Sequence, residues 1–130
     1  MELKNKDYYG GIGLATVYTI GNINLQTVNL VAKAIKETEA DMVIDKLVIF
    51  DSEKSEKIQN DQVEIYRKYF GDFVREGVRI EKDGSIPANV LMQVFSGGEE
   101  KIVDLTNGQK VTSSLLFMAA NLCKIEKIYY

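Results

Sequence analysis

The chain has 130 residues, 45% of them hydrophobic and 27% charged, which is enough to bury the core of one domain but not of two. Its formal net charge of −3 argues against binding of long DNA or RNA through a basic surface. With one cysteine, Cys123, and no histidine, the sequence excludes an intrachain disulfide, Cys or His metal cages, and Ser-His-Asp or Cys-His catalytic centres.

In the first half of the chain, apolar runs alternate with amphipathic stretches. The run LATVYTI, residues 14–20, is rich in β-branched and aromatic residues and predicts a strand. A helix is predicted next, because apolar residues recur at helical spacing at positions 28, 31, 32 and 35. The run KLVIF, residues 46–50, is almost continuously apolar, as expected of a strand covered on both faces.

The second half repeats this alternation. Charges of alternating sign over residues 51–61 predict a solvated loop or helix start. The helix that follows carries an apolar stripe that we assign to the core, namely Tyr66, Tyr69, Phe70 and Phe73. A further helix is predicted to open at Ser85 and Pro87. The remaining expected elements are a weak strand at 78–80, strands at 101–105 and 124–130, and a last helix at 112–123.

Strands that alternate with helices imply right-handed βαβ crossovers. We therefore predict a single domain over residues 1–130 with an α/β fold, a Rossmann-like three-layer sandwich around a mostly parallel central sheet. The last helix is apolar almost all round, which predicts that it is fully buried. In so small a domain, such burial suggests that one side of this helix meets a second copy of the chain.

Ligands of open parallel sheets bind beyond the carboxyl ends of the strands, so the loops at those ends are the candidate site. In the loop DLTNGQK, Gly108 permits close approach of a ligand and Lys110 supplies a positive charge. Thr112 and Ser113 stand where a helix begins, with free backbone N–H groups. Together these residues predict a phosphate site. The alternative is an ordinary Asn-Gly turn followed by a helix N-cap.

The loop TIGNINLQT follows the first strand and carries Thr19, Gly21, Asn22 and Asn24. Asn24 is more simply the N-cap of the next helix, whereas Asn22 is a candidate for contacts with a base edge or a sugar hydroxyl. Two strand-end acids, at positions 51 and 104, would suit a magnesium ion, but one acid on each of two strands is a weak signal. For Asp104 we favour burial and hydrogen bonding under its loop.

No apolar run reaches about 18 residues, so no membrane-spanning helix is predicted. The first ten residues lack the apolar segment of a secretion signal. We expect a cytoplasmic protein with no membrane partner, no metal and no resident cofactor.

The string VDLTNGQKVTSSLLFMAA resembles the hallmark of CARF domains, the CRISPR-associated Rossmann-fold sensors. These domains typically end their fourth strand in Asp-Leu-Thr or Asp-Ile-Thr, followed by a Gly-x-Lys turn and a helix that opens with small hydroxyl residues. The chain departs from the pattern in two ways. It has Asn107 where the family usually has glycine, and no candidate for the family's sixth strand precedes Tyr130.

The resemblance implies a homodimer whose paired loops form one pocket for a cyclic oligoadenylate, such as the tetra- or hexa-adenylate, in type III CRISPR antiviral signalling. Lys110 and the amides around Gly108 would then hold phosphates, while the first loop would contact ribose or adenine. The ligand-binding residues implied are Thr19, Gly21, Asn22, Asn24, Thr106, Asn107, Gly108, Gln109, Lys110, Thr112 and Ser113.

Some CARF domains also open the ring without metal, as ring nucleases, by attack of a ribose 2′-hydroxyl on its own phosphate. In this chain the corresponding catalytic residues would be Lys110 and Asn22. Sensing alone and sensing with cleavage both fit the sequence. Two other classes are an FMN-binding flavodoxin-like domain and a receiver-like or purely structural interaction module. The receiver class is disfavoured because residues 19–24 contain no acid.

Overall fold

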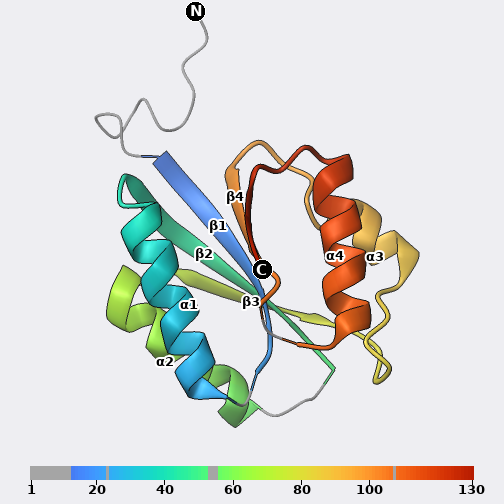
Figure 1. Cartoon of the computed structure of the whole chain (residues 1–130), viewed down its shortest axis with the longest axis horizontal. Helices are drawn as coiled ribbons and strands as arrows, with labels where there is room; N and C mark the ends of the chain where they lie inside the picture. Colours follow the sequence, from blue (N-terminus) through green and yellow to red (C-terminus); the bar gives the residue numbers. More distant parts are fainter. Residues whose placement is uncertain (1–12, 23, 53–55, 107) are drawn as a thin grey trace, which may run out of the picture.

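The computed structural model describes residues 13–22, 24–52, 56–106 and 108–130. Strands and helices alternate along the chain, as Figure 1 shows. The strands are β1 (Gly13–Ile20), β2 (Met42–Asp51), β3 (Val74–Arg79), β4 (Glu100–Asp104) and β5 (Lys127–Tyr129). The helices are α1 (Leu25–Thr38), α2 (Glu56–Phe70), α3 (Ala88–Gln93) and α4 (Lys110–Leu122).

The strands form one sheet in which every pairing is parallel, in the order β3-β2-β1-β4-β5. The chain moves outward from β1 through β2 to β3 and then crosses to the other side of β1 for β4 and β5. This order matches the first five strands of the doubly wound Rossmann sheet. The Rossmann-like α/β sandwich predicted from the sequence is confirmed, and its topological switch point lies between β1 and β4.

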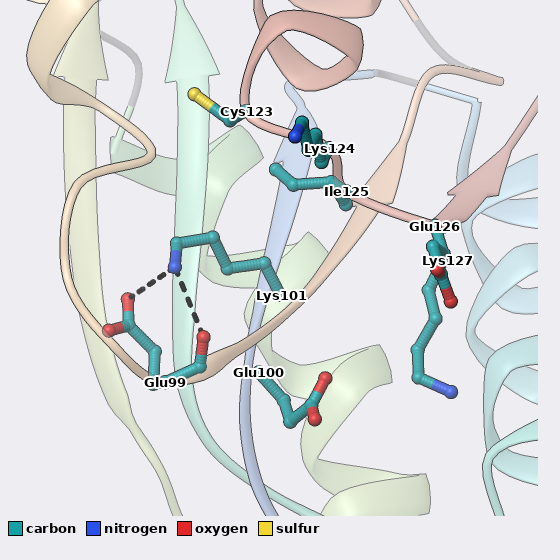
Figure 2. Close-up of a pocket in the computed structure, with 8 residues that line it drawn as sticks. All are labelled: Glu99, Glu100, Lys101, Cys123, Lys124, Ile125, Glu126 and Lys127. Atoms are coloured by element: carbon teal, nitrogen blue, oxygen red, sulfur yellow. Dashed lines mark hydrogen bonds and ion pairs between the residues drawn. The ribbon is translucent and has the colours of Figure 1, made fainter.

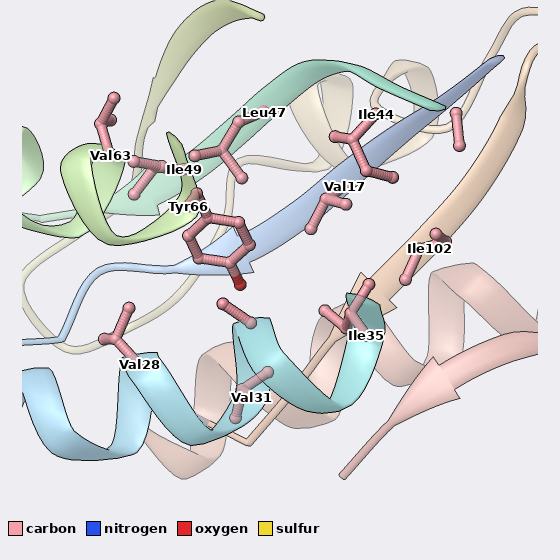
Figure 3. Packing of buried hydrophobic residues seen from close by; sticks show 12 residues of the cluster. Val17, Val28, Val31, Ile35, Ile44, Leu47, Ile49, Val63, Tyr66 and Ile102 are labelled. Carbon is pink, nitrogen blue, oxygen red and sulfur yellow. The ribbon is translucent and has the colours of Figure 1, made fainter. Parts of the chain in front are cut away.

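The sheet is covered on both faces, which gives three layers (Figure 1). Helices α1 and α2 pack on one face, where their apolar side chains meet those of β1, β2 and β4, including Val17, Leu47 and Ile102 (Figure 3). Helices α3 and α4 pack on the other face against a second cluster that includes Tyr18, Phe50 and Val103. Burial on both faces explains why β2 is almost continuously apolar near its carboxyl end.

Helix α1 forms where the apolar spacing predicted it. The buried side chains are those at the four predicted positions, Val28, Val31, Ala32 and Ile35. The Asn24 side chain accepts a hydrogen bond from the Thr27 N–H at 3.2 Å, so the predicted N-cap is confirmed. The capping residue therefore fixes where the β1–α1 loop ends.

Several boundaries differ from the sequence prediction for physical reasons. Strand β2 starts at Met42, earlier than the predicted run at 46–50. Its first residues vary between exposed and buried, so they form no continuous apolar run that would have predicted them as part of a buried strand. Helix α2 ends at Phe70, where Gly71 adopts a positive φ of 73°, so Phe73 packs on the core from outside the helix. Helix α4 starts at Lys110, which places this lysine in the first turn of the helix.

The prediction that the last helix is buried on all sides is wrong for the single chain. Its buried residues are Thr112, Leu116, Ala119 and Ala120, which form one face. The opposite face exposes Val111, Met118 and Leu122, whose exposed fractions are 48%, 49% and 78%. Within the described part of the chain, no helix is both long enough and apolar enough to cross a membrane.

Candidate functional site

The loops that follow β1 and β4 lie side by side at the switch point. The Thr19 hydroxyl, at the end of β1, donates a hydrogen bond of 2.8 Å to the Asp104 carboxylate at the end of β4, and both side chains are fully buried. Gly108 packs directly on Ile20, and a Cβ atom at this position would overlap the Ile20 side chain. Because Gly108 also has a φ of 93°, glycine is required there both for its conformation and for the close approach of the two loops.

The β1–α1 loop is held in place from below by helix α2. The amide of Gln62 donates to the Ile20 carbonyl and accepts from the Asn22 N–H, each at 3.2 Å, and Gln62 is fully buried. The Asn22 side chain in turn accepts from the Asn24 N–H at 2.9 Å. These bonds order the loop backbone and fix Asn22 at its surface.

Gly21 stands where a side chain would collide with a neighbouring strand. A Cβ atom there would lie 2.7 Å from the Asp51 carboxyl group, which closes the end of β2. The Gly21 N–H donates to the Phe50 carbonyl at 2.8 Å. The predicted ligand residue Gly21 therefore also has a packing role.

The β4–α4 loop is organised by Asp104. One carboxylate oxygen accepts from Thr19, and the other accepts from the Thr106 N–H at 2.8 Å, so a single buried acid ties the loop to both strands. This agrees with the expectation that Asp104 is buried and hydrogen-bonded. Thr106, Gly108, Gln109 and Lys110 are exposed around it. The predicted ligand residue Asn107 lies outside the described residues.

The first turn of α4 rests on the turn that follows β3, a contact that the sequence analysis missed. The Thr112 hydroxyl donates to the Gly84 carbonyl at 2.7 Å, and the Gln109 amide donates to the Lys82 carbonyl at 3.1 Å. The signal was present as the Asp83-Gly84 pair, which is typical of a tight turn. Thr112 is fully buried, so its hydroxyl positions α4. The Ser113 hydroxyl, 3.3 Å from the Leu105 carbonyl to which it donates, is only partly buried.

Tyr66 of α2 is fully buried close to Thr19 and Asp104, whereas the sequence predicted only that it belongs to the core. Figure 3 shows its ring between the sheet and α1. Among the described residues, the Tyr66 hydroxyl finds no hydrogen-bond partner of normal geometry. Burial raises the pKa of Tyr66 and the charge of Asp104 raises it further, while the Thr19 hydroxyl partly opposes the shift. The phenol therefore stays protonated beneath the site.

The resulting surface combines a cation, backbone donors and amide side chains. Lys110 is exposed in the first turn of α4, where the Gln109 side chain makes no capping bond. The first N–H groups of a helix lack intrahelical acceptors, and the positive end of its dipole lies there. Asn22 lies on the neighbouring loop. Such a surface can bind a phosphate and at the same time contact a polar group of the molecule that carries it.

A separate cavity of about 220 Å³ opens near the starts of β4 and β5, at the amino ends of these strands (Figure 2). It is lined by charged residues such as Glu100 and Lys127, together with Cys123. Lys101 is already engaged there, 2.9 Å from the Gly97 carbonyl and 3.1 Å from the Glu99 carbonyl. This charged cavity lies away from the carboxyl ends of the strands and includes none of the predicted site residues.

Comparison of the chain with known protein families and with curated protein sequences gives no match. The fold and the strand-end loops define a Rossmann-like α/β domain with a candidate anion site at its switch point.

Proposed function

We propose that the protein binds a cyclic oligoadenylate second messenger as a homodimer, in type III CRISPR antiviral signalling. The observation that carries this proposal is the contact between the two loops, made by the Thr19–Asp104 hydrogen bond and by the packing of Gly108 on Ile20. A ligand the size of a nucleotide that binds at one loop would therefore also reach the other.

In this proposal, the β4–α4 loop and the first turn of α4 bind the phosphates. Lys110 and the first N–H groups of α4 supply charge and donors, and Gly108 leaves the backbone open to close approach. The ribose and base would contact Asn22, Asn24 and Thr106, which lie at the surface on either side of the switch point. Asn24 uses its side-chain oxygen to cap α1, which leaves its NH₂ group as the donor.

A homodimer matches a cyclic ligand because a two-fold axis presents the same residues to each half of the ring. Val111, Met118 and Leu122 form the exposed apolar stripe of α4, which begins beside the site because Val111 directly follows Lys110. These residues are spaced by seven and then four positions, so they share one side of the helix. Burial of this stripe against its symmetry mate would bring the two sites together.

The same site can open the ring without a metal. The 2′-hydroxyl oxygen of one ribose bonds to the adjacent phosphorus and releases its proton, while the bond from phosphorus to the 5′ oxygen breaks and that oxygen takes up a proton. Lys110 would stabilise the charge that develops on the phosphate, and Asn22 would orient the ribose. Fixed geometry and charge suffice, so no histidine is needed.

The test is to incubate the protein with labelled cyclic tetra- and hexa-adenylate, measuring binding by gel shift and products by chromatography. Lys110→Ala is expected to weaken binding by about 10- to 100-fold, because a charge-assisted contact to phosphate is lost at each half of the pocket. Asn22→Ala should weaken binding less. Lys36→Ala, an exposed lysine in the last turn of α1, is the control and should bind normally.

Unchanged binding by Lys110→Ala would show that the phosphate role is wrong, and failure of the wild type to bind either ring would overturn the whole proposal. Cleavage that depends on Lys110 and persists in a metal chelator would establish ring opening. The strand order does not support the alternative of an FMN-binding flavodoxin-like domain. Flavodoxin-like sheets follow the order 2-1-3-4-5, whereas this sheet follows the order 3-2-1-4-5.

A further inference from the structure

A second cavity opens beside the proposed phosphate site, between α4 and the carboxyl ends of β4 and β5. Its volume is about 320 Å³, and it is lined by Leu105, Ser113, Ser114, Phe117 and Tyr130. We call it the aromatic cavity, because two exposed rings form its walls. Phe117 is 40% exposed and Tyr130 is 83% exposed.

The two rings are arranged to receive a third. Their centroids lie 5.6 Å apart and their planes meet at 89°, so the edge of one ring faces the other. A flat heterocycle that enters the aromatic cavity would stack on one ring and meet the edge of the other. Leu105 adds apolar surface, while the Ser114 hydroxyl offers a donor and an acceptor to the rim of the heterocycle and the Ser113 hydroxyl, which donates to Leu105, offers an acceptor.

The aromatic cavity is continuous with the β4–α4 loop. Leu105 begins that loop, and Ser113 both lines the cavity and donates to the Leu105 carbonyl. Phe117 follows Lys110 by seven residues, or about 10 Å along the helix axis. This span is comparable to one nucleotide, with its phosphate at the start of α4 and its base two turns further on.

We propose that the aromatic cavity takes an adenine base of the bound cyclic oligoadenylate, an assignment that rests on the function proposed above. The base stacks on the face of Phe117 or Tyr130, and the phosphate of the same nucleotide lies at Lys110. The exposed apolar stripe of α4 points to a different side of the helix, so base binding and dimer formation use different residues.

The experiment measures binding of cyclic tetra- and hexa-adenylate by calorimetry for two matched pairs of variants. Phe117→Leu and Tyr130→Leu keep apolar bulk but remove a ring, whereas Phe117→Tyr and Tyr130→Phe keep the ring. Loss of a stacking ring is expected to weaken binding by roughly tenfold, within the range of about 5- to 150-fold known for base–aromatic stacking. The ring-keeping variants should stay within about twofold of the wild type. Light scattering of each variant monitors the dimer.

Each outcome decides between the two proposals. If the leucine variants remain dimeric and bind weakly while their ring-keeping partners bind normally, the assignment stands. If both leucine variants bind like the wild type while Lys110→Ala does not, the base does not occupy the aromatic cavity, although the proposed function survives. Equal weakening by leucine and ring-keeping variants also overturns the stacking role. If the wild type binds neither ring, both proposals fail.

Discussion

Three buried polar side chains meet beneath the candidate site, and they differ in how well they are paired. Asp104 receives hydrogen bonds from the Thr19 hydroxyl and the Thr106 N–H, whereas the Tyr66 hydroxyl has no partner of normal geometry in the described part of the chain. A buried carboxylate depends on such bonds, because its desolvation is costly unless hydrogen bonds compensate for it. The two loops should therefore be sensitive to loss of Thr19 and insensitive to loss of the Tyr66 hydroxyl.

We expect Thr19→Val to lower the free energy of unfolding by about 1–3 kcal/mol, the usual effect of removing one partner from a buried charged hydrogen bond. Valine keeps the shape of threonine and its strand preference, so the lost hydrogen bond is the main change. Urea denaturation of the two proteins measures the difference. A valine variant as stable as the wild type would show that the bond between β1 and β4 contributes nothing.

Tyr66→Phe is expected to leave the free energy of unfolding unchanged or to raise it by up to about 1 kcal/mol, because it removes a buried hydroxyl that has no partner of normal geometry among the described residues. The ring and its packing against α1 and the sheet are kept. The same urea experiment serves, with Tyr66→Leu as the comparison that removes the ring and should destabilise strongly. A clear loss of stability in Tyr66→Phe would indicate that the hydroxyl is bonded in solution.

At the scale of elements, the sequence predicted each strand and helix that the described residues form, but not the contacts between them. Apolar spacing located α1 because its four inward positions recur at helical intervals. It could not show that Gln62, which directly follows the stretch of alternating charges, turns inward and forms hydrogen bonds with the β1–α1 loop. Such contacts join residues about forty positions apart, and local pattern carries no information about them. The burial of α4 was overestimated because composition does not distinguish a core face from an exposed apolar face.

Strand β5 has only three residues and is tied to α1 by a polar cluster. Glu39, at the C-cap of α1, accepts from Lys127 at 2.8 Å and from the Tyr129 hydroxyl at 2.7 Å. Burial alone would raise the pKa of Glu39, but the hydrogen bonds from Lys127 and Tyr129 outweigh it and hold the pKa below its ordinary value of 4.5. The cluster therefore favours the ionised carboxylate.

We expect Glu39→Gln to destabilise the protein by about 1–2 kcal/mol at pH 7. A lowered pKa in the folded state means that the stabilisation is fully present above pH 4.5 and disappears as the pH falls through the lower, folded-state value. Urea denaturation of wild type and variant should thus converge in acid. Glu37→Gln, an exposed neighbour on α1, is the control. A difference that persists unchanged at pH 3 would contradict the assignment.

At the scale of the whole molecule, the strand order concentrates the candidate chemistry at one point. Because β1 and β4 are neighbours, the loops after them meet, and the turn after β3 supports α4 from beside the site through Thr112 and Gln109. The sequence indicated the two loops as polar strand ends. Their contact follows from the crossover of the chain between β3 and β4, which places β4 next to β1.

The exposed stripe of α4 gives the proposed dimer a direct test. We expect the wild type to be a dimer and the double variant Met118→Glu with Leu122→Glu to be a monomer, because two buried charges without partners would face their symmetry mates. Light scattering after gel filtration measures the mass. Leu30→Glu changes an equally exposed leucine on α1, with an exposed fraction of 66%, and should remain dimeric.

The monomeric variant should also bind cyclic oligoadenylate at least about tenfold more weakly, since half of the contacts to the ring are lost. A wild type that is monomeric at concentrations where it binds the ring would show that one chain is sufficient and that the stripe has another role.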